Sequence, residues 1–254
     1  MESPLYANRF PAGAIENYLA ESWTINSNIP IGSFRAPRSN FIASAEQSFL
    51  DEIAEIIGKD PIDFRIELLE KAKHHPIGEK NDYDADRMIA VLNLVREKSD
   101  WDKPSPSGIH RGVSVYFCHN SYSAQVLDLK MEGDKPIIQR VCCAVDCGIV
   151  INPDAATNLA EGAIVDGIGN ALFGELTFQN GVPEKNNFHQ YRMIRMSEAP
   201  LKIDVYFVDN GIDPTGLGEP TFPPVFAALA NAMYRATNKR LYHQPFLEKQ
   251  EIVG

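Results

Sequence analysis

A change of hydrophobic period near residue 105 constrains the fold more than any other feature of this 254-residue chain. Before it, apolar residues recur at helical spacing, and after it they alternate, as in strands that bury one face. The polar, proline-rich residues 101–108 separate the two patterns and are typical of a boundary. We therefore predict an α+β fold, with an irregular arm and a helical segment over residues 1–105 and a mixed sheet with packed helices over residues 106–254.

Three helices are predicted in the first segment. The first is amphipathic, and its predicted buried face consists of Phe41, Ala45, Phe49, Ile53 and Ile57. Asp60 and Pro61 supply an N-cap and a first-turn proline for the second helix. The third extends from Asp84 to about Lys98. Residues 1–33 lack a sustained period, which predicts an irregular arm that lies on something larger.

Strands and two more helices are predicted in the second segment. The alternating stretches are residues 112–118, 123–131, 137–145 and 203–208, with a turn at Asn180-Gly181. A helix opens at Asn152 and continues through Gly169, and its small residues let another backbone or a bulky ligand lie close. Prolines at 223 and 224 can open the last helix.

Composition excludes some functions. Lys+Arg number 24 against 34 Asp+Glu, and the net charge of -10 argues against a nucleic-acid partner and favours small neutral or cationic ligands. No apolar run is long enough for a transmembrane segment, and the first residues show no export signal, which leaves the periplasm and the cytoplasm both open. None of the four cysteines forms a Cys-x-x-Cys pair, so no protein-ligated metal site is predicted.

Residues 215–220, Thr-Gly-Leu-Gly-Glu-Pro, place one carboxylate on a tight glycine turn ahead of an apolar helix. Gly216 and Gly218 allow close approaches that a Cβ would forbid, and Pro220 fixes φ directly after Glu219. Such a turn holds a carboxylate still, as a catalytic base requires. A solvated glutamate in a Gly-Pro loop is the alternative interpretation.

Three further segments accompany this turn: Phe-Arg-Ala-Pro at 34–37, Ala-Val-Asp-Cys-Gly at 144–148 with Asn-Pro at 152–153, and Asn-Phe-His-Gln-Tyr-Arg-Met at 187–193. In this order the motifs resemble the C-terminal part of the molybdopterin-binding large (beta) subunit of the xanthine dehydrogenase and aldehyde oxidase family. The similarity is greatest to the isoquinoline 1-oxidoreductase beta-subunit branch. The resemblance covers residues 30–239, nearly the whole chain, and implies half of a molybdopterin-binding domain.

The resemblance implies a role for individual residues. Members of the family oxidise aldehydes or nitrogen heterocycles with oxygen from water, at a molybdenum held by a pterin dithiolene, so no protein metal ligand is needed. Glu219 corresponds to the general base, and desolvation would make it a better one. Arg35 corresponds to a residue near substrate and cofactor that orients a carbonyl or stabilises charge; an arginine that pairs with a carboxylate to fix its loop is the alternative. Ala36, Gly216 and Gly218 are the predicted cofactor contacts.

The other motif residues leave structural readings open. Asp146 and Asn152 are explained by a strand end and a helix N-cap, and for both we favour structure. Asn187, His189 and Tyr191 alternate along an extended segment and either line a substrate channel or serve packing.

Two departures from the family pattern indicate which partner chains to expect. Leu159 stands where relatives keep a glutamine that reaches toward the cofactor. The relatives' Gly-Gly-Gly-Phe-Gly, Met-Gly-Gln-Gly and Pro-Met-Glu-Pro segments have no counterpart in this sequence. We therefore expect a molybdenum-pterin cofactor, in its simple or its cytosine dinucleotide form, shared with a partner chain that supplies the remaining half of the subunit. An iron–sulfur small subunit would accept electrons from the oxidation of a small-molecule substrate. A non-catalytic binding or scaffolding module that kept the fold is the alternative.

Overall fold

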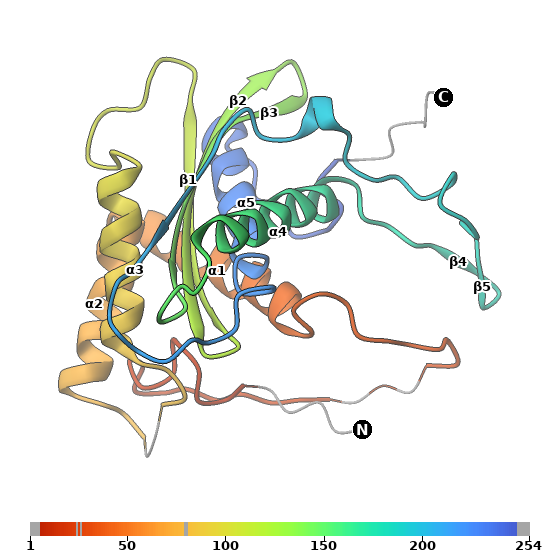
Figure 1. Cartoon of the computed structure of the whole chain (residues 1–254). Helices are drawn as coiled ribbons and strands as arrows, with labels where there is room; N and C mark the ends of the chain where they lie inside the picture. Colours follow the sequence, from red (N-terminus) through yellow and green to blue (C-terminus); the bar gives the residue numbers. More distant parts are fainter. Residues whose placement is uncertain (1–5, 24, 26, 79–80, 248–254) are drawn as a thin grey trace.

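A four-stranded mixed sheet forms the centre of the computed structural model, which describes residues 6–247 except 24, 26, 79 and 80 (Figure 1). Strands β1 (His110–Cys118), β2 (Ser121–Glu132) and β3 (Lys135–Asp146) form an antiparallel meander. Strand β6 (Ile203–Phe207) lies parallel to β3 at the edge. The predicted α+β class is confirmed, and each strand of the meander begins two residues earlier than predicted.

Helices α2 (Pro61–His74) and α3 (Ala85–Lys98) cover one face of the sheet. Asp60 caps α2 as predicted, because its carboxylate accepts hydrogen bonds from the backbone N–H groups of Ile62 and Asp63. Alternate strand residues such as Val113 and Val115 meet the buried side of both helices. This core joins residues from both sides of position 105, and the division into 1–105 and 106–254 stays a prediction.

Helices α4 (Pro153–Phe173) and α5 (Pro223–Thr237) cover the other face. A Cβ on Gly112 of β1 would collide with the backbone of Ala228 and Ala232 in α5, so this close approach needs a glycine. A Cβ on Gly167 of α4 would lie 2.9 Å from Val225 Cβ. The small residue at 167 therefore makes room for the side chain of Val225 on α5.

Helix α1 (Ser39–Ile56) corrects one prediction. The face predicted to be buried is exposed, with Phe41 63% and Phe49 62% accessible. The buried side contains Gln47, Leu50 and Asp51 instead. The physical reason is that polar contacts orient this helix: Asp51 forms ion pairs with two arginines from the C-terminal region, and Gln47 binds a buried arginine of α2. The apolar face of α1 borders a pocket of about 370 Å³ instead of the core.

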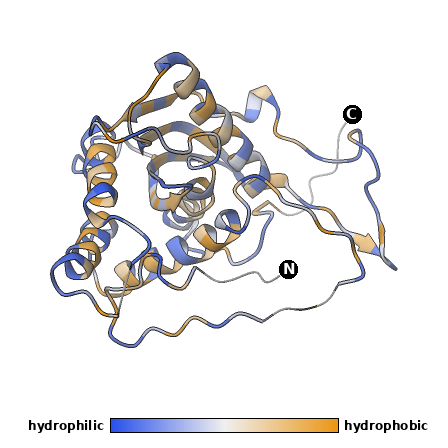
Figure 2. Cartoon of the chain, turned by 60° about the horizontal axis from the view of Figure 1, so that its bottom comes forward, coloured by the Kyte–Doolittle hydropathy of each residue, from blue (hydrophilic) through white to orange (hydrophobic). Residues whose placement is uncertain are grey.

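Two irregular segments extend from the body (Figures 1 and 2), and the first of them begins packed against it, with Phe10 and Ala14 buried. The described residues of 6–38 contain no helix or strand, in agreement with the predicted irregular arm. The second segment follows α4 and carries the small hairpin β4 (Phe178–Gln179) and β5 (Val182–Pro183) around the predicted Asn180-Gly181 turn, and then the short 3₁₀ helix η1 (Met196–Glu198). Among the helices that the structure describes, none is both long and apolar enough to cross a bilayer.

Candidate active site

Glu219 lies in the loop that leads from β6 into α5. Its Oε1 accepts a hydrogen bond from the backbone N–H of Ala36 at 3.0 Å, and its Oε2 is in contact with His119 Nε2. The side chain is 34% exposed, so the prediction of a buried carboxylate is wrong for the described chain. The reason is local: no atom lies within 4 Å of the position that a Cβ on Gly218 would occupy, which leaves this side of the loop open.

The backbone of Ala36 is shaped to reach Glu219. Ala36 adopts a left-handed conformation with φ of 53°, is fully buried, and stands just before α1. Asn40 in the first turn of α1 donates to the carbonyl of Arg35 at 3.1 Å and so ties the Phe-Arg-Ala-Pro loop to the helix. The N–H of Ala36 is used by Glu219, and contact of Ala36 with a cofactor stays a prediction.

Arg35 links three segments. Its Nε donates to the carbonyl of Gly218 at 3.0 Å, and its Nη1 lies 3.2 Å from Asp166 Oδ2 on α4. The guanidinium therefore fixes the glycine turn directly ahead of Glu219. This geometry matches the loop-fixing alternative for Arg35, and a role toward substrate or cofactor stays a prediction.

His119 is the site residue that the sequence analysis missed. It occupies the two-residue turn between β1 and β2, where His119 and Asn120 have φ of 52° and 60°. Two successive positive φ values are those of a type I′ hairpin turn. Two alternating runs that flank a His-Asn pair could have predicted the turn, but nothing local in the sequence could have predicted its contact with Glu219.

Gly216 brings the glycine loop against this turn. Its N–H donates to the carbonyl of His119 at 3.1 Å, and a Cβ on Gly216 would lie 2.6 Å from His119 Cβ. The protein itself therefore requires a glycine at 216. The predicted contacts of Gly216 and Gly218 with a cofactor are not tested by this geometry and stay predictions.

Cys118 and Tyr191, which flank the charged groups of the site, are held in their uncharged forms. Burial, with a smaller contribution from the nearby Glu219 carboxylate, raises the pKa of the Cys118 thiol to about 11. Burial also raises the pKa of Tyr191, with a smaller contribution from Asp166. At neutral pH both side chains can therefore donate a proton to a hydrogen bond but carry no charge.

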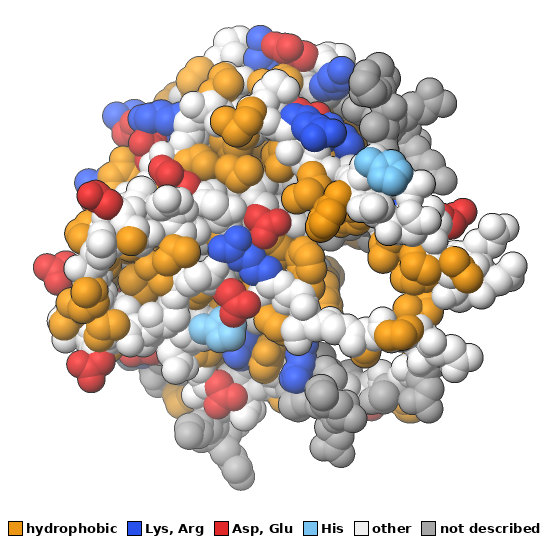
Figure 3. All heavy atoms as spheres, turned by 45° about the vertical axis from the view of Figure 1, so that its right-hand side comes forward, with side chains coloured by type: hydrophobic (Ala, Val, Ile, Leu, Met, Phe, Trp, Pro, Cys, Tyr) orange, Lys and Arg blue, Asp and Glu red, His pale blue; other side chains and the backbone are white. Residues whose placement is uncertain are grey.

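A pocket of about 310 Å³ adjoins Arg35. One wall is the exposed side of α4, where Gly162 and Asp166 lie, and the other comes from Tyr191 and Arg192. Of the alternating residues in this segment, Tyr191 lines the pocket, whereas the side chains of residues 187 and 189 are exposed. Figure 3 shows that apolar side chains gather on this side of the molecule, beside an opening.

Asp146 and Asn152 have the structural roles that the sequence favoured. Asp146, at the end of β3, is fully buried and receives hydrogen bonds from Arg87 at 2.7 and 3.0 Å and from Asn210 at 2.8 Å. Burial alone would raise the pKa of Asp146, but these donors together lower it below its ordinary value. Asn152 caps α4 by accepting from the N–H of Ala155 at 3.1 Å.

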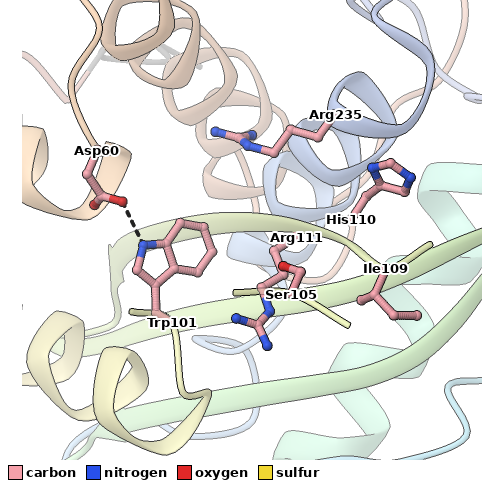
Figure 4. A pocket seen from close by; sticks show the side chains of 7 residues that line it. All are labelled: Asp60, Trp101, Ser105, Ile109, His110, Arg111 and Arg235. Carbon is pink, nitrogen blue, oxygen red and sulfur yellow. Dashed lines mark hydrogen bonds between the residues drawn. The ribbon is translucent and has the colours of Figure 1, made fainter. Parts of the chain in front are cut away.

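A second pocket, of about 340 Å³, lies near the start of β1 (Figure 4). The indole N–H of Trp101 donates to Asp60 at 2.7 Å. Arg111 pairs with Asp128 at 3.1 Å, and Arg235 pairs with Asp51 at 3.0 Å. The charged groups that line this pocket already have partners, so it is a weaker candidate than the region around Glu219.

Comparisons with known proteins agree with the motifs. A family model described as a molybdopterin cofactor-binding domain matches residues 86–200. The chain is 30% identical to a membrane-bound aldehyde dehydrogenase [pyrroloquinoline-quinone] of Gluconacetobacter polyoxogenes, over 93% of this chain and 31% of that protein. It is 31% identical to the isoquinoline 1-oxidoreductase subunit beta of Brevundimonas diminuta, over 79% of this chain and 25% of that protein.

The fold also has solved relatives. Quinoline 2-oxidoreductase from Pseudomonas putida 86 superposes with a TM-score of 0.71 at 10% identity, over 86% of this chain and 52% of that one. Residues 86–200 thus match a molybdopterin cofactor-binding domain, and the chain is similar to part of the molybdopterin-dependent oxidoreductases of the xanthine dehydrogenase and aldehyde oxidase family, as its motifs predicted. It spans less than a third of the length of the two curated relatives.

Proposed function

We propose that this chain is part of the catalytic subunit of a molybdenum hydroxylase that oxidises an aldehyde or a nitrogen heterocycle with oxygen from water. The observation that carries the proposal is the position of Glu219, which is held by Ala36 and His119 and open to solvent on its remaining side. A fixed carboxylate with an accessible lone pair is what a general base needs. The chain would be active only with the rest of the subunit.

The residues beside Glu219 fit one side of a molybdenum-pterin cofactor. The pocket next to Arg35 has small residues on α4, where Gly162 leaves open space, and hydrogen-bond donors in Tyr191 and Arg192. Together with Gly218, these residues would hold the cofactor, in its simple or its cytosine dinucleotide form. When bound, the cofactor would supply the two-electron oxidation chemistry.

The chain's own residues would manage the proton and the orientation of the reacting groups. Glu219 would accept a proton from the water-derived oxygen as that oxygen attacks the substrate carbon. Arg35 would hold the turn that carries Glu219, through the Gly218 carbonyl and Asp166. A positioned base of this kind typically contributes about two to four orders of magnitude to the rate.

Two partner chains complete the proposal. The remaining half of the molybdopterin-binding subunit would close the pocket, since the curated relatives are more than three times as long as the matched part. An iron–sulfur small subunit would take up the electrons; the relative named as a subunit beta supports a multi-subunit enzyme. Exposed apolar side chains such as Trp23 (84%) and Phe188 (83%) on the extended segments offer surface for such contacts.

The test compares the chain alone with the chain co-purified with its partner. Molybdenum, pterin and quinone are quantified in both samples, because one relative carries pyrroloquinoline quinone in its name. We expect near-stoichiometric molybdenum and pterin only in the complex. Turnover of an aldehyde and of an N-heterocycle is then measured with Glu219→Gln, which should lose at least about two orders of magnitude. Equal turnover in Glu219→Gln would rule out the assigned base.

Leu159 favours the alternative, a non-catalytic binding or scaffolding module. Its side chain on α4 is 46% exposed, so it is an apolar residue on the side of the helix where relatives place a glutamine. Leu159→Gln should increase cofactor retention in the complex if the pocket is used, since it adds a polar partner. Unchanged retention together with absent turnover would support the scaffolding module.

A further inference from the structure

His119 reaches Glu219 from a hairpin turn that the family motifs do not include. Both carboxylate oxygens of Glu219 have a neighbour that can donate a hydrogen bond: Oε1 has the Ala36 N–H at 3.0 Å, and Oε2 has His119 Nε2. A carboxylate held through one oxygen can still rotate about its last bond. Donors on both oxygens fix the plane of the group and leave its remaining lone pairs to other partners.

The hairpin turn that carries His119 is anchored on several sides. The Gly216 N–H donates to the His119 carbonyl at 3.1 Å, and the hydroxyls of Ser121 and Thr215 lie 2.6 Å apart. Arg87 of α3 donates to the carbonyl of Asn120 at 3.2 Å. The imidazole therefore extends from a fixed backbone, and its side chain remains 49% exposed.

We propose that His119 is a positioning residue that holds the Glu219 carboxylate in the orientation needed for proton transfer, by donating its Nε2–H to Oε2. The inference rests on the proposed function, since it assumes that Glu219 is the base. Placement matters for such a step, because a displacement of about 1 Å in a reacting group can cost about 10²-fold in rate. Among the described residues, Arg35 is directed at Asp166 and the Gly218 carbonyl, and the thiol of Cys118 lies close enough to Glu219 for the carboxylate to raise its pKa.

The first experiment tests the contact itself and needs no cofactor. The chain is labelled with ¹⁵N-histidine, and the signals of its six histidines are recorded at about pH 8, where imidazoles are mostly neutral. His119→Gln assigns the His119 signals. We expect His119 to show the Nε2-protonated tautomer in the wild type, with an Nε2 signal that shifts when Glu219→Ala removes the hydrogen-bond acceptor. His119 signals that do not change in Glu219→Ala would overturn the inference, and unchanged signals of the other histidines control for the fold.

The second experiment separates positioning from packing in the assembled enzyme. His119→Phe keeps a ring but removes the donor, whereas His119→Gln keeps a neutral N–H near the position of Nε2. Both replacements put a side chain at φ of 52°, so their backbone cost is matched. We expect kcat to fall about 10- to 100-fold in His119→Phe, with KM within about twofold of wild type, and to recover in His119→Gln.

The outcomes distinguish this inference from the proposed function. Full kcat in His119→Phe beside an inactive Glu219→Gln would overturn the positioning role and leave the base in place. Full activity in Glu219→Gln would overturn the base itself. Equal loss of kcat in His119→Phe and His119→Gln would also overturn the inference, because the hydrogen-bond donor kept by glutamine would then fail to recover kcat.

Discussion

Asp146 and Glu219 are two carboxylates of one molecule in contrasting environments. Asp146 is fully buried, and its oxygens receive hydrogen bonds from Arg87, Asn210 and the backbone N–H of Gly148. Glu219 is 34% exposed, with one neighbouring donor for each oxygen. A carboxylate whose acceptor sites are filled inside the protein can only maintain structure. One with open acceptor capacity is available for chemistry.

The two carboxylates are connected through one arginine. Arg87 pairs with Asp146 and also donates to the carbonyl of Asn120, in the turn that carries His119. Its guanidinium also lies 4.7 Å from the centre of the Tyr122 ring. Through Arg87, Asp146 thus helps to fix the hairpin turn whose His119 contacts Glu219. The buried Arg87–Asp146 pair therefore supports the candidate site.

The largest expected effect is that of Asp146→Asn on stability. The change leaves Arg87, whose side chain is only 15% exposed, without its counter-charge, and breaking such a buried pair costs about 3–5 kcal/mol. The free energy of unfolding from urea titration measures this loss. The control is Asp102→Asn, which breaks the exposed pair with Arg96 and should leave stability nearly unchanged. Equal losses of unfolding free energy in the two variants would mean that the buried ion pair stabilises the fold no more than the exposed one.

A matched pair on α1 extends the comparison to apolar residues. Leu50→Ala should cost about 2–5 kcal/mol because Leu50 is 3% exposed in the core. Phe49→Ala, one position away and 62% exposed, should change the free energy of unfolding by less than about 0.5 kcal/mol. Urea titration of both variants decides which face of α1 is buried. A larger loss of unfolding free energy from Phe49→Ala would mean that the face predicted from hydrophobic spacing is the buried one.

Acid should reproduce part of the Asp146→Asn loss in the wild type. The pKa of Asp146 is lower in the folded chain than its ordinary value, so its ionised form contributes stability above the unfolded carboxyl pKa of about 3.9. That contribution is lost as pH falls below this value and through the lowered folded pKa. The urea midpoint of the wild type should therefore fall more steeply below about pH 4 than that of Asp146→Asn. The same pH dependence of the urea midpoint in both proteins would show that unfolding does not change the protonation of Asp146.

Local signals in the sequence predicted the regular elements well. Alternation predicted all four strands of the main sheet, and Asp60, Asn152 and the Asn180-Gly181 turn marked boundaries that the structure confirms. These features depend on residues that are neighbours along the chain, which is why a single sequence is enough to find them.

Contacts between distant segments were not predictable in the same way. The orientation of α1 depends on the pairing of Asp51 with Arg235 and Arg240, which lie far away in the sequence. The contact of His119 with Glu219 likewise depends on the packing of the β1–β2 turn against the glycine loop. The motifs predicted Glu219 as the base, because glycines and a proline around a carboxylate are a local signal, and that role stays a prediction. The residue that completes its surroundings has no such signal.

The smallest expected effect, and the one that sharpens the comparison most, is that of Glu219→Gln on stability. The side chain is 34% exposed, and a glutamine oxygen can still accept from the Ala36 N–H, so the free energy of unfolding should change by less than about 0.5 kcal/mol. Thermal and urea unfolding of both variants, measured together, make the test. A loss in Glu219→Gln as large as that in Asp146→Asn would mean that Glu219 maintains the structure, and it would favour the scaffolding module over the catalytic base.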